Sequence, residues 1–433
     1  MVRILLILLV VPGLLWARIR SAPNDSTARS AAPSPGDTLV LTMHGAREAF
    51  LQRNLAVMAA RYHLTSSEAD LIAAGLFPNP QLSFNASYAG LFQKPADYSQ
   101  TQTSYRVDQP LDLFGKRSQR ITMAEHSVES ARADFANTLF QMTCDFKEAF
   151  LTAAFAGRLH DLARERLALF QRTVASSATR FKTGDIAESE FTKLRLAELD
   201  YRQAESDAAQ ASTDAMASLR QMLVVPPDVP LRETYSFRPM LMLPSRDSLA
   251  AMAMVSRADL MAQHERTLTQ QSRIDLAYRT AWPDFSIGVE LDRQAPQWKN
   301  TVGGGVSLSL PLFSRNQDEI QRSEAEFEAA KLDERARENA VRNGVHAAYD
   351  KFHTSYEIFR SLSDSTLLQA ADIRAAAAKS YALGNISLVD FLETERIYND
   401  AVTSYLNALN RYAVNQVELE RAVGASLFEE DNQ

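Results

Sequence analysis

Residues 379–391, KSYALGNISLVDF, place a glycine and an asparagine inside a long helical pattern, where both residues are unfavourable. The stretch FKTGDIAESEF, residues 181–191, has the same design 200 positions earlier. The turn residues pair at this offset: Gly184 with Gly384, and Asp185 with Asn385. A left-handed glycine ends a helix, and Asp or Asn is a strong N-cap for the next one. Each stretch is therefore predicted to reverse the chain between two helices.

The similarity between the two halves extends well beyond these turns. The run Gln109-Pro110-Leu111 matches Leu310-Pro311-Leu312, and Pro80 matches Pro283. We therefore predict two internal repeats, each with a helix, two strands, a very long helix, a glycine turn and a shorter helix. The predicted segments are a signal peptide at 1–17, a flexible lead-in at 18–37, the repeats at 38–225 and 246–424, a linker at 226–245 and a tail at 425–433.

Four segments alternate apolar and polar residues, which indicates strands. They lie at about 80–92, 101–113, 283–293 and 301–313. Each is long enough for a tilted strand to cross a bilayer, and small Ser, Asn and Gly residues on the polar face suit a water-filled lumen. Four strands cannot close a barrel, so a membrane barrel would need several chains. Two hairpins that cover a soluble core are the alternative interpretation.

The helical segments predict an elongated molecule. Residues 115–181 and 314–381 each read as one helix of roughly 100 Å at 1.5 Å per residue. The shorter segments are each roughly 55 to 60 Å, so two placed end to end match one long helix; they are 38–76, 185–224, 246–281 and 385–424. The expected fold class is mainly α with a small β part, built as a long antiparallel α-helical barrel.

Composition excludes some classes of function. The chain has 46 Lys and Arg against 53 Asp and Glu, a formal net charge of −7, and the charges are interspersed, so nucleic-acid binding is not expected. A basic start, the apolar run ILLILLVVPGLLW and a small residue are typical of a signal peptide. With Cys144 as its single cysteine, the chain has no intrachain disulfide. No catalytic, cofactor or metal-binding motif stands out, so we do not expect an enzyme.

Four pieces of sequence, in this order and with this duplication, resemble the TolC family of outer-membrane efflux proteins. They are AARYHLTSSEADLIAAGLFPNPQLSF (59–84), QPLDLFGKR (109–117), AWPDFSIGVEL (281–291) and LSLPLF (308–313). The resemblance implies a homotrimer in the outer-membrane lipid, with four strands per chain in a twelve-stranded barrel and a periplasmic helical tunnel. It also implies docking to a periplasmic adaptor and an inner-membrane pump. A soluble periplasmic coiled-coil scaffold or adaptor is the alternative.

Within this family the two glycine turns form the periplasmic tip of the tunnel. The resemblance implies that five residues constrict or latch the pore there: Tyr381, Asp390, Glu393, Ser189 and Glu190. Ile386 stands where the family has an arginine, so a latch built on that arginine is not expected and closure would depend on packing and other contacts. Repeated around a threefold axis, the acids would favour cations.

The segment QPLDLFGKR is similar to the one after the second strand in heavy-metal efflux proteins of the resistance-nodulation-division type. Metal ions, other small toxic compounds and secreted proteins all stay open as cargo. For Gly115, Lys116 and Arg117 we predict a strand-to-helix corner with solvated cations, not a contact with cargo.

Overall fold

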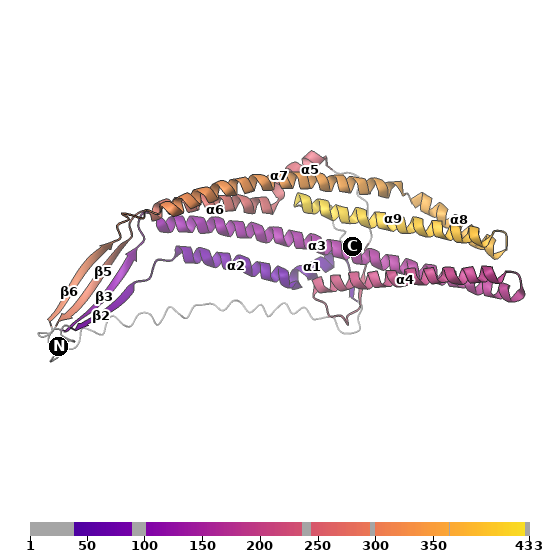
Figure 1. Cartoon of the computed structure of the whole chain (residues 1–433), viewed down its shortest axis with the longest axis horizontal. Coiled ribbons are helices and arrows are strands. Elements are labelled where there is room, and N and C mark those ends of the chain that lie inside the picture. Colours follow the sequence, from indigo (N-terminus) through magenta and orange to yellow (C-terminus); the bar gives the residue numbers. More distant parts are fainter. Residues whose placement is uncertain (1–38, 89–100, 236–243, 295–298, 363, 429–433) are drawn as a thin grey trace.

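The computed structural model describes residues 39–88, 101–235, 244–294, 299–362 and 364–428. The molecule is elongated, with a small sheet at one end and helices that run side by side to the other end (Figure 1). The two glycine turns lie at the end farthest from the sheet. The prediction of a mainly helical chain with a small sheet part is confirmed. The predicted signal peptide and lead-in lie outside the described residues, as do residues 429–433 of the predicted tail.

The sheet contains four antiparallel strands in the order β2-β3-β5-β6. Their bounds are β2 Gln81–Tyr88, β3 Thr101–Leu111, β5 Phe285–Gln294 and β6 Lys299–Leu308. Strand β3 belongs to the first half of the chain and pairs with β5 of the second half, so the sheet joins the two halves. Within the described residues, β2 and β6 each have a neighbour on one side only. The sheet therefore ends in two unpaired edges.

The strand register separates apolar and polar side chains onto opposite faces. One row across the sheet consists of Leu82, Val107 and Val289. The next row, on the other face, consists of Ser83, Arg106 and Glu290. Leu82 is 74% exposed and Val289 is 60% exposed, so the rest of the chain does not cover the apolar face. Burial of this face requires something outside the chain.

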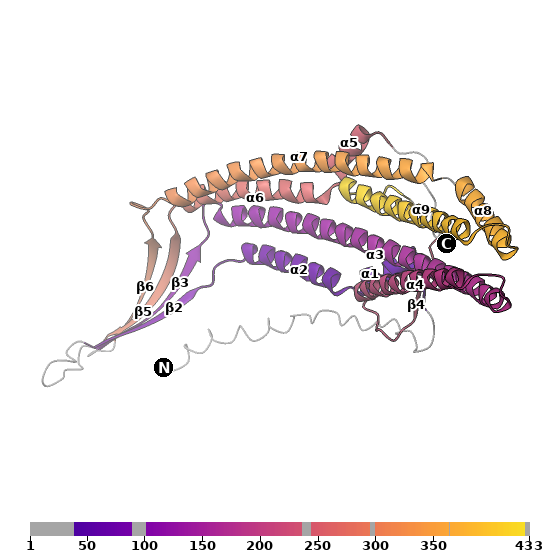
Figure 2. The same cartoon turned by 45° about the vertical axis from the view of Figure 1, so that its right-hand side comes forward.

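Helices make up the remainder of both halves in the same order. The first half contains α1 Met43–Arg53, α2 Leu55–Gly75, α3 Lys116–Thr183 and α4 Glu188–Leu223. The second half contains α5 Arg246–Ser256, α6 Ala258–Thr280, α7 Gln317–Ser361, α8 Asp364–Ala382 and α9 Leu388–Val423. In both views α2 and α4 follow one another along α3, which has 68 residues (Figure 2). Two shorter helices therefore match one long helix. Among the described residues no helix is long and apolar enough to cross a membrane.

Two predicted helices are each interrupted. Residues 38–76 begin with a short strand, β1 Leu39–Leu41, which pairs in parallel with β4 Leu231–Glu233 of the predicted linker. The same segment breaks at Asn54, because its Oδ1 accepts hydrogen bonds from the backbone N–H groups of Ala56 and Val57 and so caps α2. Residues 246–281 break at Arg257, whose backbone is extended.

The prediction of one helix over 314–381 is also wrong. Helix α7 ends at Ser361 and α8 begins at Asp364, and Figure 2 shows α8 leaving the direction of α7. The sequence SLSDST at 361–366 is rich in side chains that compete for backbone hydrogen bonds. The Ser361 hydroxyl does so, since it donates to the Ile358 carbonyl at 2.7 Å.

The strand-to-helix corner at Gly115 exists, but its cations are not solvated as predicted. Lys116 is buried, and its Nζ donates to the Trp282 carbonyl and to Asp284 Oδ1, both at 2.7 Å. The side chain is enclosed because pairing of β3 with β5 brings the start of α3 against the connection from α6 to β5. Lys116 therefore ties the two halves together beneath the sheet.

The core lies in the middle of the molecule, where both halves meet. Phe146 and Phe150 of α3 pack with α1 and α4, and Tyr412 of α9 packs with α5 and α7. Between these clusters, Cys144 and Leu151 of α3 contact α9 directly. Burial raises the pKa of the Cys144 thiol to about 12, so the thiol stays neutral as a packing group.

A buried carboxylate fixes the end of α9 in this core. Glu420 is 2% exposed, and its Oε2 accepts from Lys147 Nζ of α3 at 2.9 Å. Its Oε1 accepts from the backbone N–H groups of Leu427 and Phe428 at 2.9 and 3.1 Å. This side chain of α9 thus binds both α3 and the segment that follows α9.

We expect Glu420→Gln to destabilise the protein by about 3 to 5 kcal/mol, because it removes the charge of a buried carboxylate that pairs with the Lys147 ammonium. Urea unfolding of the detergent-solubilised protein measures the change. Asp333→Asn, which removes an exposed carboxylate of α7, is the control and should shift the midpoint little. Equal midpoints for Glu420→Gln and the wild type would contradict the role of this pair.

Candidate functional site

The site predicted from the glycine turns lies at the end of the helices. Gly184 and Gly384 have φ values of 84° and 75°, in the left-handed region that suits glycine. The residue after each glycine donates its N–H five residues back, from Asp185 to Arg180 at 2.8 Å and from Asn385 to Ser380 at 2.9 Å. This is the Schellman arrangement, and it ends the incoming helix within one residue.

Asp185 and Asn385 are not the N-caps of the outgoing helices, contrary to prediction. The N-cap positions are Ala187 and Ser387, two residues later. Asp185 Oδ2 instead accepts from the Thr183 hydroxyl at 2.7 Å, so it serves the incoming helix. The extra residues let Ile186 turn inward, where it is buried beneath the turn.

A hydrogen bond joins the two turns. The Tyr381 hydroxyl donates to Glu190 Oε1 at 3.0 Å, and Tyr381 is only 3% exposed. Burial, together with the Glu190 carboxylate, raises the pKa of the Tyr381 hydroxyl, so it remains a donor at neutral pH. Within the described part of the chain, these are the only two of the five predicted tip residues that contact each other across the turns.

The other three predicted residues are exposed, and within the described residues none of them makes a contact that joins the two turns. Asp390 contacts the N-cap of its own helix, since its N–H donates to Ser387 Oγ at 3.2 Å and its Oδ2 accepts from that hydroxyl at 2.7 Å. Glu393 pairs with Arg396 at 2.7 Å, and this guanidinium lowers the pKa of Glu393. Ser189 lies exposed on the first turn of α4.

An aromatic stack continues from Tyr381 into the body of the molecule. Tyr381 stacks on Phe391 with ring centroids 4.8 Å apart, Phe391 on Phe170 at 6.5 Å, and Phe170 on Tyr201 at 4.4 Å. These rings come from α8, α9, α3 and α4, so both helical hairpins contribute to one cluster. The contact between the hairpins near the tip is therefore mainly apolar.

Arg180 of α3 supplies a cation where Ile386 does not. Its Nη1 donates to the Tyr381 carbonyl at 3.2 Å, and its guanidinium carbon lies 5.5 Å from the centroid of the Tyr381 ring. Ile386 itself packs against the aromatic cluster. The arginine at this tip thus comes from the opposite turn.

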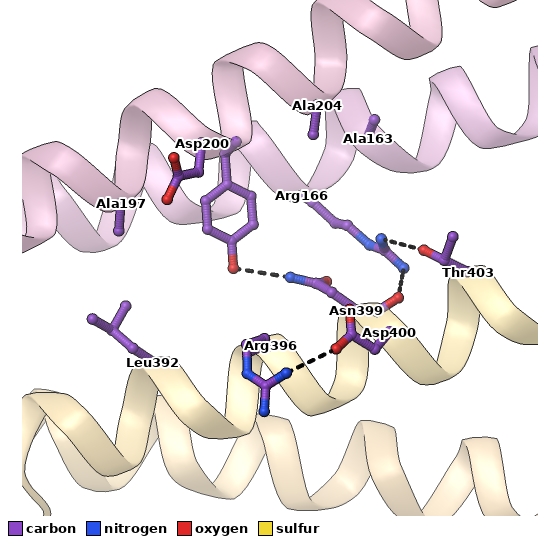
Figure 3. A pocket seen from close by; sticks show the side chains of 11 residues that line it. Ala163, Arg166, Ala197, Asp200, Ala204, Leu392, Arg396, Asn399, Asp400 and Thr403 are labelled. Atoms are coloured by element: carbon purple, nitrogen blue, oxygen red, sulfur yellow. Dashed lines mark hydrogen bonds and ion pairs between the residues drawn. The ribbon is translucent and has the colours of Figure 1, made fainter.

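A pocket opens between the two hairpins, and Tyr201 of the aromatic stack is one of the residues that line it (Figure 3). Arg166 reaches across it from α3 and donates to the Thr403 hydroxyl at 3.2 Å and to the Asn399 carbonyl at 3.4 Å. Asn399 Nδ2 donates to the Tyr201 hydroxyl at 2.9 Å. Burial lowers the pKa of Arg166 and raises that of Tyr201 to about 12. These hydrogen bonds give the hairpin contact a preferred register, because the donors and acceptors of α3, α4 and α9 meet only in one alignment.

Sequence reasoning missed Arg166, Phe170, Tyr201 and Asn399, although a signal exists. On α9 the residues that face α3 and α8 recur every three or four positions: Leu388, Phe391, Glu395, Asn399 and Thr403. That spacing marks one face of a helix, and its polar members are the ones that need partners. Glu395, which is 6% exposed, finds its partner in Arg374 of α8.

The profile of the family described as Outer membrane efflux protein matches residues 47–224 and 249–425 of this chain, which covers both halves. The chain belongs to this family. The predicted TolC-family resemblance is thereby confirmed, and the protein is an efflux channel component of the outer membrane. The alternative of a soluble scaffold or adaptor is not supported.

Similar proteins agree with this assignment. This efflux protein is 22% identical over 386 residues to the cobalt-zinc-cadmium resistance protein CzcC of Cupriavidus metallidurans, which covers 89% of this chain and 90% of that protein. It is 25% identical over 341 residues to the nickel-cobalt-cadmium resistance protein NccC of Alcaligenes xylosoxydans xylosoxydans, which covers 75% and 76%. The fold matches the crystal structure of the Campylobacter jejuni CmeC outer membrane channel with a TM-score of 0.75 and 15% identity, over 90% and 87% of the chains.

The aromatic stack makes a prediction for the tip of this efflux protein. Phe391→Ala should destabilise the contact between the hairpins by about 3 to 5 kcal/mol, because it leaves a cavity between Tyr381 and Phe170. Hydrogen exchange should become faster at the ends of α8 and α9. Val389→Ala is the control, since Val389 lies two residues away and is 65% exposed. Unchanged exchange in Phe391→Ala would show that the stack does not hold the hairpins together.

Proposed function

We propose that the chain is the outer-membrane conduit through which a tripartite system exports divalent metal ions from the periplasm. The observation that carries the choice of cargo is the similarity, over 89% of the chain, to a protein named for cobalt, zinc and cadmium resistance. The similarity to a nickel-cobalt-cadmium resistance protein points the same way. A periplasmic adaptor and an inner-membrane pump would supply the energy, since a passive channel has none.

Three copies of the chain would complete the membrane barrel. The sheet has two unpaired edges and an apolar face that the chain leaves exposed, and both defects disappear if three sheets close into one twelve-stranded barrel. The shared order of elements supports two repeats of one structural unit, and its helices would continue the barrel as a periplasmic tunnel.

The tip would be the gate of this tunnel. The Tyr381–Glu190 hydrogen bond, the Arg180 contact and the aromatic stack join the hairpins of one chain, and no charge at position 386 is needed. Opening would separate the two hairpins and would break these contacts. Adaptor binding at the turns around Gly184 and Gly384 is the expected trigger.

Carboxylates at the tip suit a cation as cargo. Glu190 and Asp390 bind hydroxyl groups and have no cationic partner among the residues that the structure describes. Glu393 is partly neutralised by Arg396. Threefold repetition would therefore form acidic rings from Glu190 and Asp390, which attract cations.

We expect Glu190→Gln with Asp390→Asn to reduce cation selectivity in planar bilayers. The amides keep hydrogen-bonding capacity but remove charge, so the reversal potential in a salt gradient should move toward zero. Asp333→Asn, far along α7 from the tip, should leave it unchanged. An unaltered reversal potential in the double variant would exclude these residues from the selectivity ring.

The cargo is tested in cells that lack the gene. Loss of the protein should lower the inhibitory concentrations of cobalt, zinc, cadmium or nickel, and expression of the wild-type chain should restore them. Hydrophobic drugs, which represent the class of other small toxic compounds, should be tolerated equally by both strains. Drug sensitivity without metal sensitivity would replace the proposed cargo with that class.

A further inference from the structure

The motif QPLDLFGKR forms the corner between β3 and α3, at the level where the sheet meets the helices (Figure 1). The function proposed above makes no use of this motif. Phe114 of the motif stacks on Trp282 with ring centroids 5.1 Å apart and lies 5.9 Å from the ring of Phe285. Trp282 is 57% exposed. The corner therefore presents aromatic surface to its surroundings.

These rings continue the apolar face of the sheet. Phe285 pairs with Leu111 in the strand register, four rows from Val289 and Val107, so Phe285 lies on the same face as those exposed valines. Aromatic side chains at the end of a lipid-facing surface are typical of the boundary between hydrocarbon and headgroups. In a sheet that spans the membrane, the corner would therefore lie at the depth of the headgroups on the side of the helices.

The guanidinium groups of two arginines at the corner have no carboxylate partner within the described residues. Arg279, at the end of α6, donates from Nη1 to the Phe114 carbonyl at 3.0 Å. Arg117 donates from Nε to the Gly75 carbonyl at 2.8 Å, and its guanidinium lies 4.5 Å from the centroid of the Phe77 ring. By contrast, the other two cations of the corner are ion-paired: Lys116 with Asp284 and Arg120 with Asp112.

The backbone is shaped to accept Arg279. Gly115 has a φ of 72°, and a Cβ at this position would lie 2.3 Å from Arg279 Nη1. The corner glycine therefore allows both the turn and the close approach of the guanidinium. A pocket next to the corner has apolar walls that include Phe77, Leu111 and Phe285, and the two ion pairs Lys116–Asp284 and Arg120–Asp112 also line it.

We propose that this corner binds the phosphate of a phospholipid headgroup in the adjacent leaflet, with Arg279 and Arg117 as the cations and Phe114 and Trp282 against the upper acyl chain. The inference rests on the proposed function, because the apolar face meets lipid only if the sheet spans the membrane. A lipid fits better than inorganic phosphate, since only a lipid would also cover the exposed rings and continue along the sheet. Arginines that are held by carbonyl oxygens and lack a carboxylate partner still have N–H groups that can donate to a phosphate oxygen.

The test titrates phosphatidylglycerol into the full-length detergent-solubilised protein and counts bound lipid by native mass spectrometry. Arg279→Gln should weaken the affinity about fivefold, the effect of one interfacial cation. Arg266→Gln is the matched control, because Arg266 is an exposed arginine of the same helix that pairs with Asp134 away from the corner. It should bind lipid as the wild type does. Equal affinity for Arg279→Gln and wild type, or equal loss in Arg266→Gln, would overturn the site.

A second variant covers the case in which Arg279→Gln fails to assemble. Ser118→Glu places a carboxylate in the first turn of α3, where the helix dipole tolerates it, next to Gly115 and Arg279. It should weaken lipid binding at least as much. Unchanged lipid binding in Ser118→Glu, or competition by millimolar inorganic phosphate that displaces the lipid, would also overturn the proposal.

Conductance of the same preparation separates the two hypotheses. If the protein conducts but these substitutions do not change its lipid affinity, only the proposed lipid site is overturned. A wild-type preparation that never conducts would overturn the proposed function instead.

Discussion

Antiparallel pairing of β3 with β5 is the contact on which the arrangement of both halves depends. It is the sole ladder in the described part of the four-stranded sheet that joins strands from different halves. The pairing brings Leu111 opposite Phe285, so the start of α3 meets the end of α6. The two helices then run side by side from this corner, and this shared starting point sets which residues of the two halves meet farther along the molecule. A shift of one residue in this ladder would turn every side chain of one hairpin to the other face.

The contacts between the halves change in kind with distance from the sheet. At the corner they are ionic and aromatic, with Lys116 buried between the halves. In the middle a packed core surrounds Glu420 of α9, whose carboxylate binds α3 and the segment that follows α9. At the tip a stack of aromatic side chains joins the hairpins, together with hydrogen bonds from Tyr381 to Glu190 and from Arg180 to the Tyr381 carbonyl. The end that we propose as the gate is thus held by aromatic packing and hydrogen bonds between the two hairpins, without a buried ion pair like Lys147–Glu420 between them in the described part of the chain.

The break between α7 and α8 lies in the same region. Helix α3 is continuous over 68 residues, whereas its counterpart ends at Ser361 and resumes at Asp364. The α8–α9 hairpin is therefore joined to the rest of its half by a change of direction, and the α3–α4 hairpin is not. The Arg374–Glu395 ion pair holds α8 and α9 together, and α9 itself runs without a break from this hairpin to the central core.

Much of this protein was determined by its sequence alone. Alternation in residues 285–291, the duplicated glycine turns and the lengths between them suffice for the strands, the reversals and the elongated shape, because each depends on local backbone preference or periodicity. Only tertiary structure decided which polar groups meet. Lys116 reads as a solvated corner residue but is buried, Arg180 rather than position 386 brings a cation to Tyr381, and Asn54 donates from Nδ2 to the Met222 carbonyl of α4. Local sequence pattern does not predict such contacts, since a side chain finds its partner only after distant segments pack together.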